Sequence, residues 1–225
     1  MKVLVIPDVH LKPWIFDEAE FILKNFKLDK AVFVGDLVDD WHKEKYVDLY
    51  KDTIDRAVLF KCMNRDSIFC YGNHEVAYMI DSWCSGNSEL FRPLIKSMLN
   101  KYERAVEPVL ATKIDNVVFS HAGIAFSYEV SYNIETIDMI RLTVAFDDDN
   151  SPLWVRPDPW NSFCKDYIQV VGHSPVRTIK QFDNVWVTDT FSTNEDGSMY
   201  GDQTFMSIDT VTGEIVKYRN RQIVR

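Results

Sequence analysis

Four of the five histidines in this chain directly follow an apolar stretch and lie within two residues of a glycine or an aspartate. Imidazole and carboxylate groups placed together in this way can bind a metal ion or transfer protons. Only His42 lies elsewhere, and metal binding or acid–base chemistry explains the position of the others better than core packing does. The four are His10, His74, His121 and His173.

The triplet Asp8-Val9-His10 follows the first apolar run of the chain. Residues two apart on an extended chain point the same way, so Asp8 and His10 could bind one metal ion. Taken by itself, the triplet is also compatible with an aspartate at a strand end followed by a surface histidine.

The segment Gly72-Asn73-His74-Glu75 follows an apolar run that ends at Tyr71 and begins a stretch with helical character. A glycine at a strand-to-helix turn gives the backbone a freedom that other residues lack. The turn would place an amide oxygen and an imidazole side by side at the carboxyl end of a sheet, where open α/β sheets bind their ligands.

Each of these polar groups comes after an apolar run that is typical of a buried strand. An amphipathic segment near residues 15–26 separates the first two runs, and Asp36 follows the second run as Asp8 follows the first. Strand, helix, strand and acidic residue in this order indicate a βαβ unit. The predicted strands are residues 2–7, 30–34, 68–71, 117–119 and 167–171.

The sequence also predicts helices and strands that carry none of the candidate site residues named so far. Helices are expected at residues 42–64 and 134–146, and a strand at 106–114. Residues 81–101 contain a loop and then a helical pattern, and could form a lid or an inserted helical piece. The C-terminal tail alternates short strands with hairpin turns and predicts a second sheet. Its strands are expected at residues 178–182, 184–188, 204–209 and 214–218.

Size and charge limit the possible functions. The 225 residues fit one large domain, or one domain with an insertion over residues 81–101. The net charge of −9 argues against non-specific binding of nucleic acid or of an anionic membrane, since both need a basic surface. The sequence leaves the oligomeric state open.

The four cysteines form no CxxC pair, and we interpret them as reduced, mostly buried thiols. No run approaches the length of about 18 apolar residues that a membrane span requires, and the first apolar run is too short for a signal peptide. We therefore expect a soluble, cytoplasmic protein.

Five short motifs follow one another along the chain: Asp8-x-His10, Gly35-Asp36-x-Val38-Asp39, Gly72-Asn73-His74-Glu75, Ser120-His121-Ala122-Gly123 and Gly172-His173-Ser174-Pro175. In this order they resemble the calcineurin-like metallophosphoesterases. They are most similar to the serine/threonine protein phosphatase branch, with its bacterial, viral and diadenosine tetraphosphatase relatives. The resemblance implies an α/β fold, a four-layer α-β-β-α sandwich of the calcineurin-like type.

The same resemblance implies two divalent metal ions at the carboxyl ends of the strands. Asp8 and His10 would bind the first ion, Asp36 would bridge both, and the second would be completed by Asn73, His121 and His173. Two such ions roughly 3.5–4 Å apart can convert a bridging water into hydroxide and clamp a phosphoryl group for in-line attack. Carboxylate, amide and imidazole ligands suit manganese, iron or zinc better than calcium, and manganese is the first expectation.

By resemblance, His74 is the general acid that protonates the leaving oxygen, with Asp39 orienting it. Asn73 would also face the substrate. General acid catalysis of this kind typically contributes 10²–10⁴-fold.

One position departs from the family pattern. The protein phosphatase branch usually has Asp-Arg-Gly where this chain has Asp39-Asp40-Trp41, so the arginine that would hold the phosphate is missing. If the Asp40 side chain points into the site, it would repel a dianionic monoester. If it points outward, the site would only lack one phosphate-binding group. Trp41 is better interpreted as a packed side chain than as a stacking platform. Arg156 is the best remaining phosphate ligand, with a surface ion pair as its alternative.

The resemblance implies a two-metal phosphoesterase of the serine/threonine protein phosphatase type that hydrolyses phosphomonoesters of a phosphoprotein or a nucleotide. A nucleotide phosphodiesterase or dinucleoside polyphosphate hydrolase is the alternative, which Asp40 would favour because a diester carries one charge less. A non-catalytic phosphate-binding scaffold on the same fold is an alternative of another class, because fold alone does not guarantee function.

Overall fold

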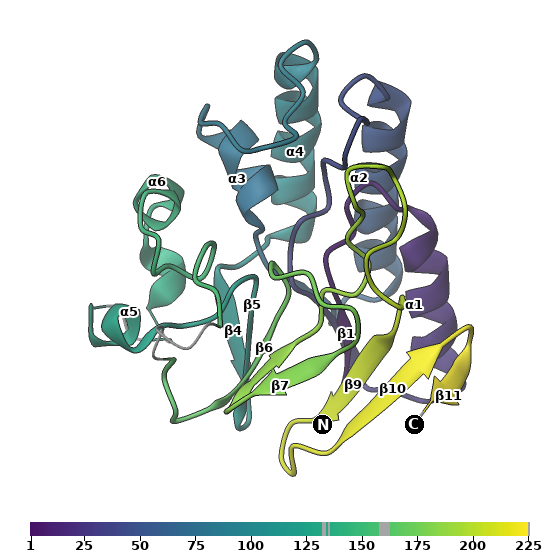
Figure 1. Cartoon of the computed structure of the whole chain (residues 1–225), viewed down its shortest axis with the longest axis vertical. Helices are drawn as coiled ribbons and strands as arrows, with labels where there is room; N and C mark the ends of the chain where they lie inside the picture. The colour runs from purple at the N-terminus through teal and green to yellow at the C-terminus, as the bar shows by residue number, and fades with distance from the viewer. Residues whose placement is uncertain (132–133, 135, 158–162, 225) are drawn as a thin grey trace.

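Two β-sheets form the centre of the computed structural model, which describes residues 1–131, 134, 136–157 and 163–224. The first sheet has the spatial order β11-β10-β9-β1-β2-β3 and the second has the order β4-β5-β6-β8-β7 (Figure 1). The first sheet contains β1 (Lys2–Ile6), β2 (Lys30–Phe33), β3 (Ile68–Phe69), β9 (Phe205–Asp209), β10 (Ile215–Arg219) and β11 (Gln222–Val224). The second contains β4 (Ala111–Ile114), β5 (Val117–Ser120), β6 (Ile168–Val171), β7 (Lys180–Phe182) and β8 (Val185–Val187).

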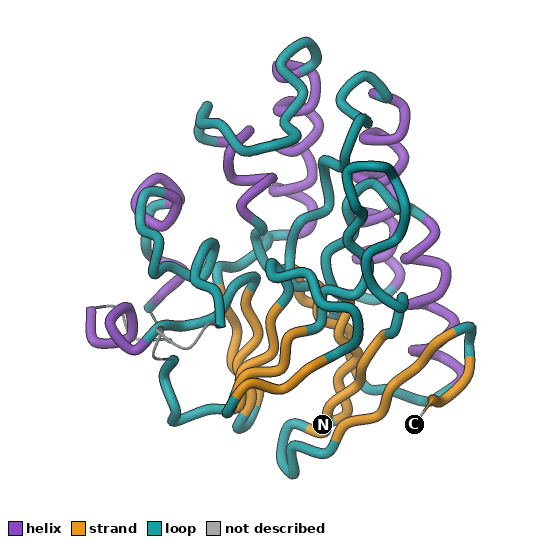
Figure 2. Tube along the Cα trace, in the orientation of Figure 1, coloured by secondary structure: helices purple, strands orange, loops and turns teal. Residues whose placement is uncertain are grey.

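Helices cover the outer faces of both sheets (Figure 2). α1 (Trp14–Asn25), α2 (Val47–Met63), α3 (Asn73–Met79) and α4 (Arg92–Val106) lie on the side of the first sheet. α5 (Phe126–Ser131), the 3₁₀ helix η1 (Ile137–Met139) and α6 (Leu142–Phe146) lie on the side of the second. The mixed α/β arrangement of two sheets flanked by helices confirms the expected fold class.

The alternation of side chains along β1 explains the layers. Successive side chains of a strand point to opposite faces, and both faces of β1 are buried. Leu4 and Ile6 belong to the core under the helices, whereas Val3 and Val5 belong to the core between the two sheets, where they join Phe119 of β5. The continuous apolar run therefore folds as a strand covered on both faces.

The helices of the first layer follow the spacing of their apolar residues. The buried side chains of α1 are Ile15, Phe16, Ala19 and Ile22, which fall on one face at helical spacing. α2 begins at Val47 rather than at residue 42, because His42 has a left-handed backbone (φ 60°) and the chain turns before the helix. The predicted start of this helix was wrong by about a turn.

The C-terminal tail does not form a sheet of its own, and this prediction was wrong. β7 and β8 form a hairpin whose β8 strand pairs parallel with β6 in the second sheet. β9 instead pairs antiparallel with β1, so β9, β10 and β11 extend the first sheet. Local alternation indicates a strand but does not indicate its partner, which depends on which apolar faces meet.

Two further boundaries differ from the prediction. α4 continues to Val106 and ends at Glu107, whose φ of 54° is a left-handed helix end, so the strand expected at 106–114 is limited to β4. The helix expected at 134–146 is, over its described residues, the short η1 followed by α6. The loop expected within 81–101 lies between α3 and α4.

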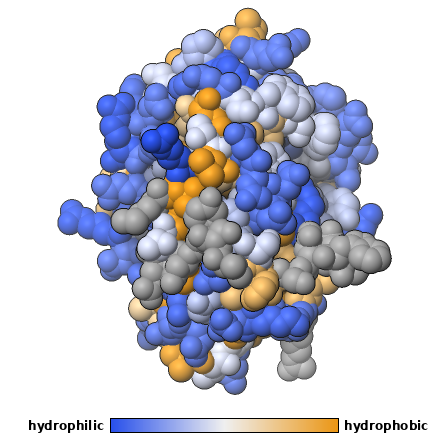
Figure 3. Space-filling view, turned by 90° about the vertical axis from the view of Figure 1, so that its left-hand side faces the viewer, coloured by the Kyte–Doolittle hydropathy of each residue, from blue (hydrophilic) through white to orange (hydrophobic). Residues whose placement is uncertain are grey.

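The surface on the side of α5 and α6 is largely hydrophilic, with an apolar area near its centre (Figure 3). In the described part of the chain, no helix combines the length and the apolar character that crossing a membrane requires. The described cysteines are all free thiols, and three of the four are buried, as expected: Cys70, Cys84 and Cys164.

Candidate metal centre and active site

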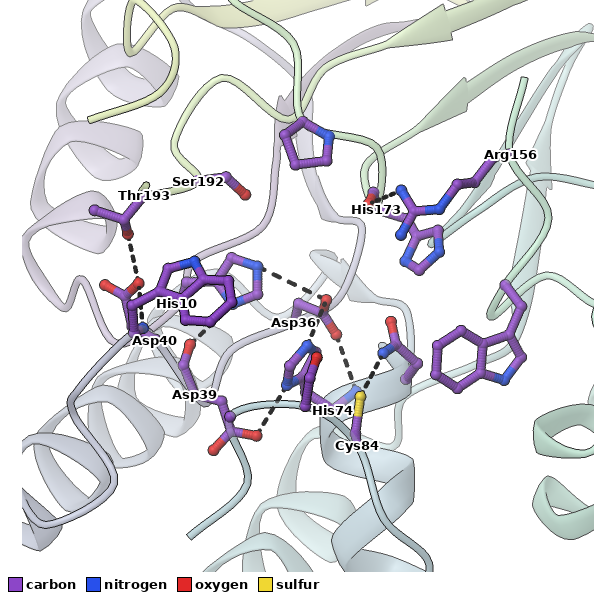
Figure 4. Close-up of a pocket in the computed structure, with 16 residues that line it drawn as sticks. His10, Asp36, Asp39, Asp40, His74, Cys84, Arg156, His173, Ser192 and Thr193 are labelled. Carbon is purple, nitrogen blue, oxygen red and sulfur yellow. Dashed lines mark hydrogen bonds and ion pairs between the residues drawn. The ribbon is translucent and has the colours of Figure 1, made fainter. Parts of the chain in front are cut away.

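The predicted metal ligands come from five segments that meet where the strands end, and Figure 4 labels His10, Asp36 and His173 among them. Asp8 and His10 follow β1, Asp36 follows β2, and Asn73 begins α3 directly after the turn at Gly72. His121 and His173 follow β5 and β6 of the second sheet. The structure therefore brings all six predicted ligands, Asp8, His10, Asp36, Asn73, His121 and His173, to one place.

Backbone hydrogen bonds hold these loops against one another. The amides of Val9 and His10 donate to the carbonyl oxygen of Asp36 at 2.8 and 2.9 Å, and the amide of Gly172 donates to that of His121 at 2.8 Å. The side chain of Glu75 also accepts from the amides of Leu37, Val38 and Gly72, at 2.6, 3.0 and 3.0 Å. The motif glutamate thus ties the loop after β2 to the start of α3.

Four site residues adopt left-handed backbone conformations although none is glycine. The φ angles are 43° at His10, 47° at Asp36, 64° at Asp39 and 57° at His173. Such conformations are uncommon for residues with a Cβ and cluster at functional sites, where the surrounding structure holds them in place. The turns aim the side chains across the strand ends rather than along the strands.

The predicted ligands form two groups that share one carboxylate. Asp8, His10 and Asp36 make the first group, and Asp36, His121 and His173 make the second; within each, the ligand atoms lie within 4.8 Å of one another. Oδ2 of Asp36 is 3.8 Å from Nε2 of His10 and 3.3 Å from Nε2 of His121. Asp36 is therefore placed between the two groups, as a bridging ligand would be.

Atoms that could bind a metal ion converge in the second group. Nδ1 of His121 donates to the carbonyl oxygen of Val34 at 2.8 Å, which leaves its Nε2 as a lone pair in the neutral ring. This Nε2 faces Oδ1 of Asn73 at 2.8 Å and Nδ1 of His173 at 3.1 Å, as well as Asp36. When His121 is neutral, its Nε2 lone pair and the two oxygens repel one another, and a proton or a metal ion between them removes that repulsion.

The first group shows the same chemistry. Nδ1 of His10 donates to the carbonyl oxygen of Asp39 at 2.9 Å, so its Nε2 is also directed to the site. Among the described residues, buried Oδ1 of Asp8 and buried Nε2 of His173 have no hydrogen-bond partner. Buried polar atoms are rarely left in this state, and the donor set fits divalent transition metals.

The protonation states also favour metal binding. Burial lowers the pKa of His10, and burial together with the neighbouring His121 and Arg156 lowers that of His173 well below its usual value. Both rings are therefore neutral near pH 7, which is the form that binds a metal. Burial raises the pKa of Asp36, but the nearby His121 and His74 outweigh it and hold that pKa well below its usual value.

Two glycines allow the close approach of these loops. A Cβ added at Gly72 would lie 2.2 Å from Oδ1 of Asp36, and one at Gly172 would lie 1.8 Å from Oδ1 of Asp8. Neither glycine has a positive φ, so the requirement is space rather than backbone conformation. Any larger residue at these positions would displace a predicted ligand.

His74 lies beside the ligands but is held by different contacts. Its Nδ1 is 2.9 Å from Oδ2 of Asp39, and its Nε2 is 3.9 Å from Oδ2 of Asp36 (Figure 4). Burial lowers the pKa of His74, but the charge of Asp36 and the hydrogen bond to Asp39 outweigh it and raise that pKa well above its usual value. The ring is therefore held in the protonated form that a general acid needs.

Asp39 is fixed by three further donors. The hydroxyl groups of Tyr50 and Tyr78 donate to its Oδ1 at 2.7 and 2.8 Å, and Nδ2 of Asn87 donates to its Oδ2 at 2.6 Å. Asn87 belongs to the loop between α3 and α4, so this loop contributes to the site from within the segment whose role the sequence left open.

A pocket of about 250 Å³ opens over the site. Its wall combines predicted ligands and His74 with residues from two loops that were not expected at the site, residues 84–86 and 192–193. The lining residues are His10, Asp36, Asp39, Asp40, Trp41, Asn73, His74, Cys84, Ser85, Gly86, Trp154, Arg156, His173, Pro175, Ser192 and Thr193.

A sequence model described as calcineurin-like phosphoesterase matches residues 1–210. The chain belongs to the calcineurin-like phosphoesterase family. It is accordingly a hydrolase of phosphoester bonds, from a family that uses divalent metals. No curated protein matches the sequence.

Solved structures show the same fold. A cold-active protein-tyrosine phosphatase from a psychrophilic Shewanella superposes with a TM-score of 0.61 at 17% identity, over 96% of this chain and 77% of that one. A protein serine/threonine phosphatase from Saccharomyces cerevisiae superposes with a TM-score of 0.58 at 15% identity, over 100% and 78%. At these identities the likeness concerns the fold alone.

Arg156 of this phosphoesterase lines the pocket, and its role as a phosphate ligand stays a prediction. Its Nη1 donates to the carbonyl oxygen of His173 at 2.9 Å and to Oγ of Ser174 at 3.2 Å. These contacts anchor the guanidinium at the rim on the side of the second ligand group.

Asp40 points inward, but its charge is matched. Its carboxylate lines the pocket, and Nζ of Lys12 lies 3.1 Å from its Oδ2. The hydroxyl of Thr193 donates to its other oxygen. Of the two orientations considered for Asp40, the structure has the inward one, with a buried lysine beside it that sequence reasoning did not identify. A lysine two residues after a predicted ligand was the only available signal.

Trp41 is 47% exposed and lines the pocket, so the prediction of a packed tryptophan was wrong.

The loop between α3 and α4 supplies Cys84, whose Sγ accepts a hydrogen bond from Nδ2 of Asn73 at 3.0 Å. This bond orients the amide so that its oxygen faces His121. Nothing in the sequence around Cys84 indicated this contact, because the loop carries no motif.

Proposed function

We propose that this phosphoesterase is a two-metal phosphomonoesterase similar to the serine/threonine protein phosphatases. The observation that carries the proposal is the placement of the His74–Asp39 pair beside Asp36, in a pocket that Arg156 also lines. A proton donor, a phosphate-binding cation and a shared metal ligand then face one substrate.

Two metal ions would be held by Asp8, His10 and Asp36 on one side and by Asp36, Asn73, His121 and His173 on the other. When bound, the pair supplies an activated water and neutralises charge on the phosphoryl group. Manganese is proposed first, with iron or zinc as alternatives, because the ligands are mixed oxygen and nitrogen donors.

The other site residues act on the substrate. Arg156 binds phosphoryl oxygens through its guanidinium, whose geometry suits two oxygens at once. Nε2 of His74 gives its proton to the leaving oxygen as the ester bond breaks, and Asp39 orients the ring and stabilises its charge. Asn73, next to His74, lines the same pocket and faces the substrate.

A phosphorylated protein or a nucleotide fits this chemistry, and we propose a phosphoprotein first because both reported structural neighbours are named as protein phosphatases. The charge of Asp40 was the sequence feature that favoured a diester. Its pairing with Lys12 removes that argument. Convergence of the ligand atoms and the anchored His74 weigh against a non-catalytic scaffold.

The test is hydrolysis of p-nitrophenyl phosphate and bis-p-nitrophenyl phosphate by the purified protein, with Mn²⁺ and with a chelator. We expect a Mn²⁺-dependent preference for the monoester. A preference for the diester would contradict the monoesterase proposal, and absence of turnover of both, together with tight phosphate binding, would favour the scaffold.

A further inference from the structure

We propose that Lys12 is a specificity-determining residue of this enzyme. Its ammonium group cancels the charge of Asp40 in the pocket wall, and this cancellation allows a dianionic phosphomonoester to bind. The inference rests on the proposed phosphoesterase function and adds the residue that sets the charge preference of the site.

The position of Lys12 is unusual for a lysine. The residue is only 8% exposed, and the side chain of its partner Asp40 is 10% exposed. Nζ lies 3.1 Å from Oδ2 of Asp40, 3.2 Å from Oγ1 of Thr193 and 3.0 Å from the carbonyl oxygen of His10. Lysine is rarely buried to this extent unless it is paired.

The pair faces the substrate unequally. Asp40 lines the pocket together with His10 and Asp39, whereas Lys12 contacts Asp40 without being one of the lining residues. Without the ammonium group, the wall would present an uncompensated negative charge to the substrate. A monoester dianion carries about one charge more than a diester monoanion, so it would be repelled more strongly.

The magnitude follows from the separation of the charges. Unit charges several ångströms apart, at an effective dielectric constant of about 20, change an equilibrium by roughly tenfold or more. Screening by salt is reduced for groups as buried as these. A change of this size is large enough to alter which ester the site prefers.

A structural role predicts something different. Lys12 also contacts the carbonyl oxygen of His10 and the loop that carries Thr193. Loss of those contacts would disturb the site for both esters alike, and loss of Asp40 would disturb it in the same direction. Charge cancellation instead predicts opposite effects of the two single substitutions.

The experiment compares the parent with Lys12→Met, Asp40→Asn and the double variant. The quantity is the ratio of kcat/KM for p-nitrophenyl phosphate to that for bis-p-nitrophenyl phosphate with saturating Mn²⁺. We expect Lys12→Met to lower the ratio by about tenfold and Asp40→Asn to raise it, with the double variant close to the parent. Lys51→Met is the matched control, because it removes the same charge from an exposed pair with Asp55.

A second readout is independent of turnover. Calorimetric titration of the Mn²⁺-loaded proteins with inorganic phosphate should give the same order, with Asp40→Asn binding most tightly and Lys12→Met most weakly. If Lys12→Met does not fold, Asp40→Asn alone still tests the proposal. Charge cancellation requires the Asp40→Asn protein to bind phosphate more tightly than the parent does.

The proposal is overturned if both single variants shift the ratio or the phosphate affinity in the same direction, or if neither shifts it. Failure of the proposed function is a separate result. In that case the parent would prefer the diester or hydrolyse neither ester with Mn²⁺, while the order of phosphate affinities would still test Lys12.

Discussion

Nδ1 of His74 lies 2.9 Å from Oδ2 of Asp39, and that carboxylate also accepts hydrogen bonds from Tyr50, Tyr78 and Asn87. Asp39 lies in the loop after β2, and His74 lies in the first turn of α3, which follows the neighbouring parallel strand β3. Because the carboxylate is held by groups from α2, α3 and the loop after α3, the imidazole has one orientation available, with Nε2 toward Asp36.

The role of His74 can be measured through the leaving group. His74→Asn should lower kcat by about 10²–10⁴-fold for an alkyl phosphate, whose leaving oxygen needs a proton. The loss should be smaller for p-nitrophenyl phosphate, because its phenolate leaves without protonation. Steady-state kinetics on both substrates, with metal content measured alongside, checks this. An equal loss on both substrates would contradict the general acid role.

Asp39 should set the alkaline limit of activity. The hydrogen bond to Asp39 helps to raise the pKa of His74, and a general acid works only while it is protonated. Activity should therefore fall as the pH rises through that pKa. In Asp39→Asn, the lost negative charge lowers the pKa of His74, so the fall should begin at a lower pH. The pH profile of kcat checks this, and a shift toward higher pH would show that the sign is wrong.

Metal binding should stabilise the protein. The converging acceptor atoms of Asp36, Asn73 and His121 are unfavourable without a cation, and a ligand that binds only the native state raises stability. At a metal concentration of about 100 times Kd the gain is about 2.7 kcal/mol, or roughly 5–10 °C in Tm for a chain of this size. Thermal unfolding with Mn²⁺ and with chelator measures it. Asp36→Asn serves as the comparison, and an equal Tm shift in that variant would place the metal elsewhere.

Arg156 should contribute to substrate binding rather than to stability. Arg156→Ala should raise KM for p-nitrophenyl phosphate by roughly 10–100-fold, the range for a lost hydrogen bond to a charged group. Arg156→Lys keeps the positive charge but loses the planar guanidinium group, so its KM should lie between those of the parent and Arg156→Ala. The residue is exposed, so Tm should change little. Unchanged KM in both variants would favour the surface ion pair considered from the sequence.

Much of the site could be predicted because its residues obey local rules. An apolar run followed by Asp8-Val9-His10 or by Gly72-Asn73-His74 predicts a buried strand with polar groups at its carboxyl end. The same rule located Asp36, His121 and His173, and the two-sheet α/β fold followed from the ordered motifs. The structure places all of them together, while their individual roles stay predictions.

Contacts between distant segments could not be predicted from local pattern. The pairing of β9 with β1 joins residues about two hundred positions apart, and the alternation of β9 is the same whichever sheet it enters. Cys84 and Asn87 carry no motif, yet the loop between α3 and α4 brings them to Asn73 and Asp39.

The sequence by itself determined which side chains are available at the strand ends for metal binding and proton transfer, because that depends on residue type and spacing. Only the tertiary structure decided whether the negative charge of Asp40 in the pocket wall is compensated. Asp40 read alone predicts repulsion of a dianion, but Lys12 and Thr193, the latter from the C-terminal part of the chain, fold against it. Electrostatic balance depends on distance in space, and these distances are fixed only when the loops pack together.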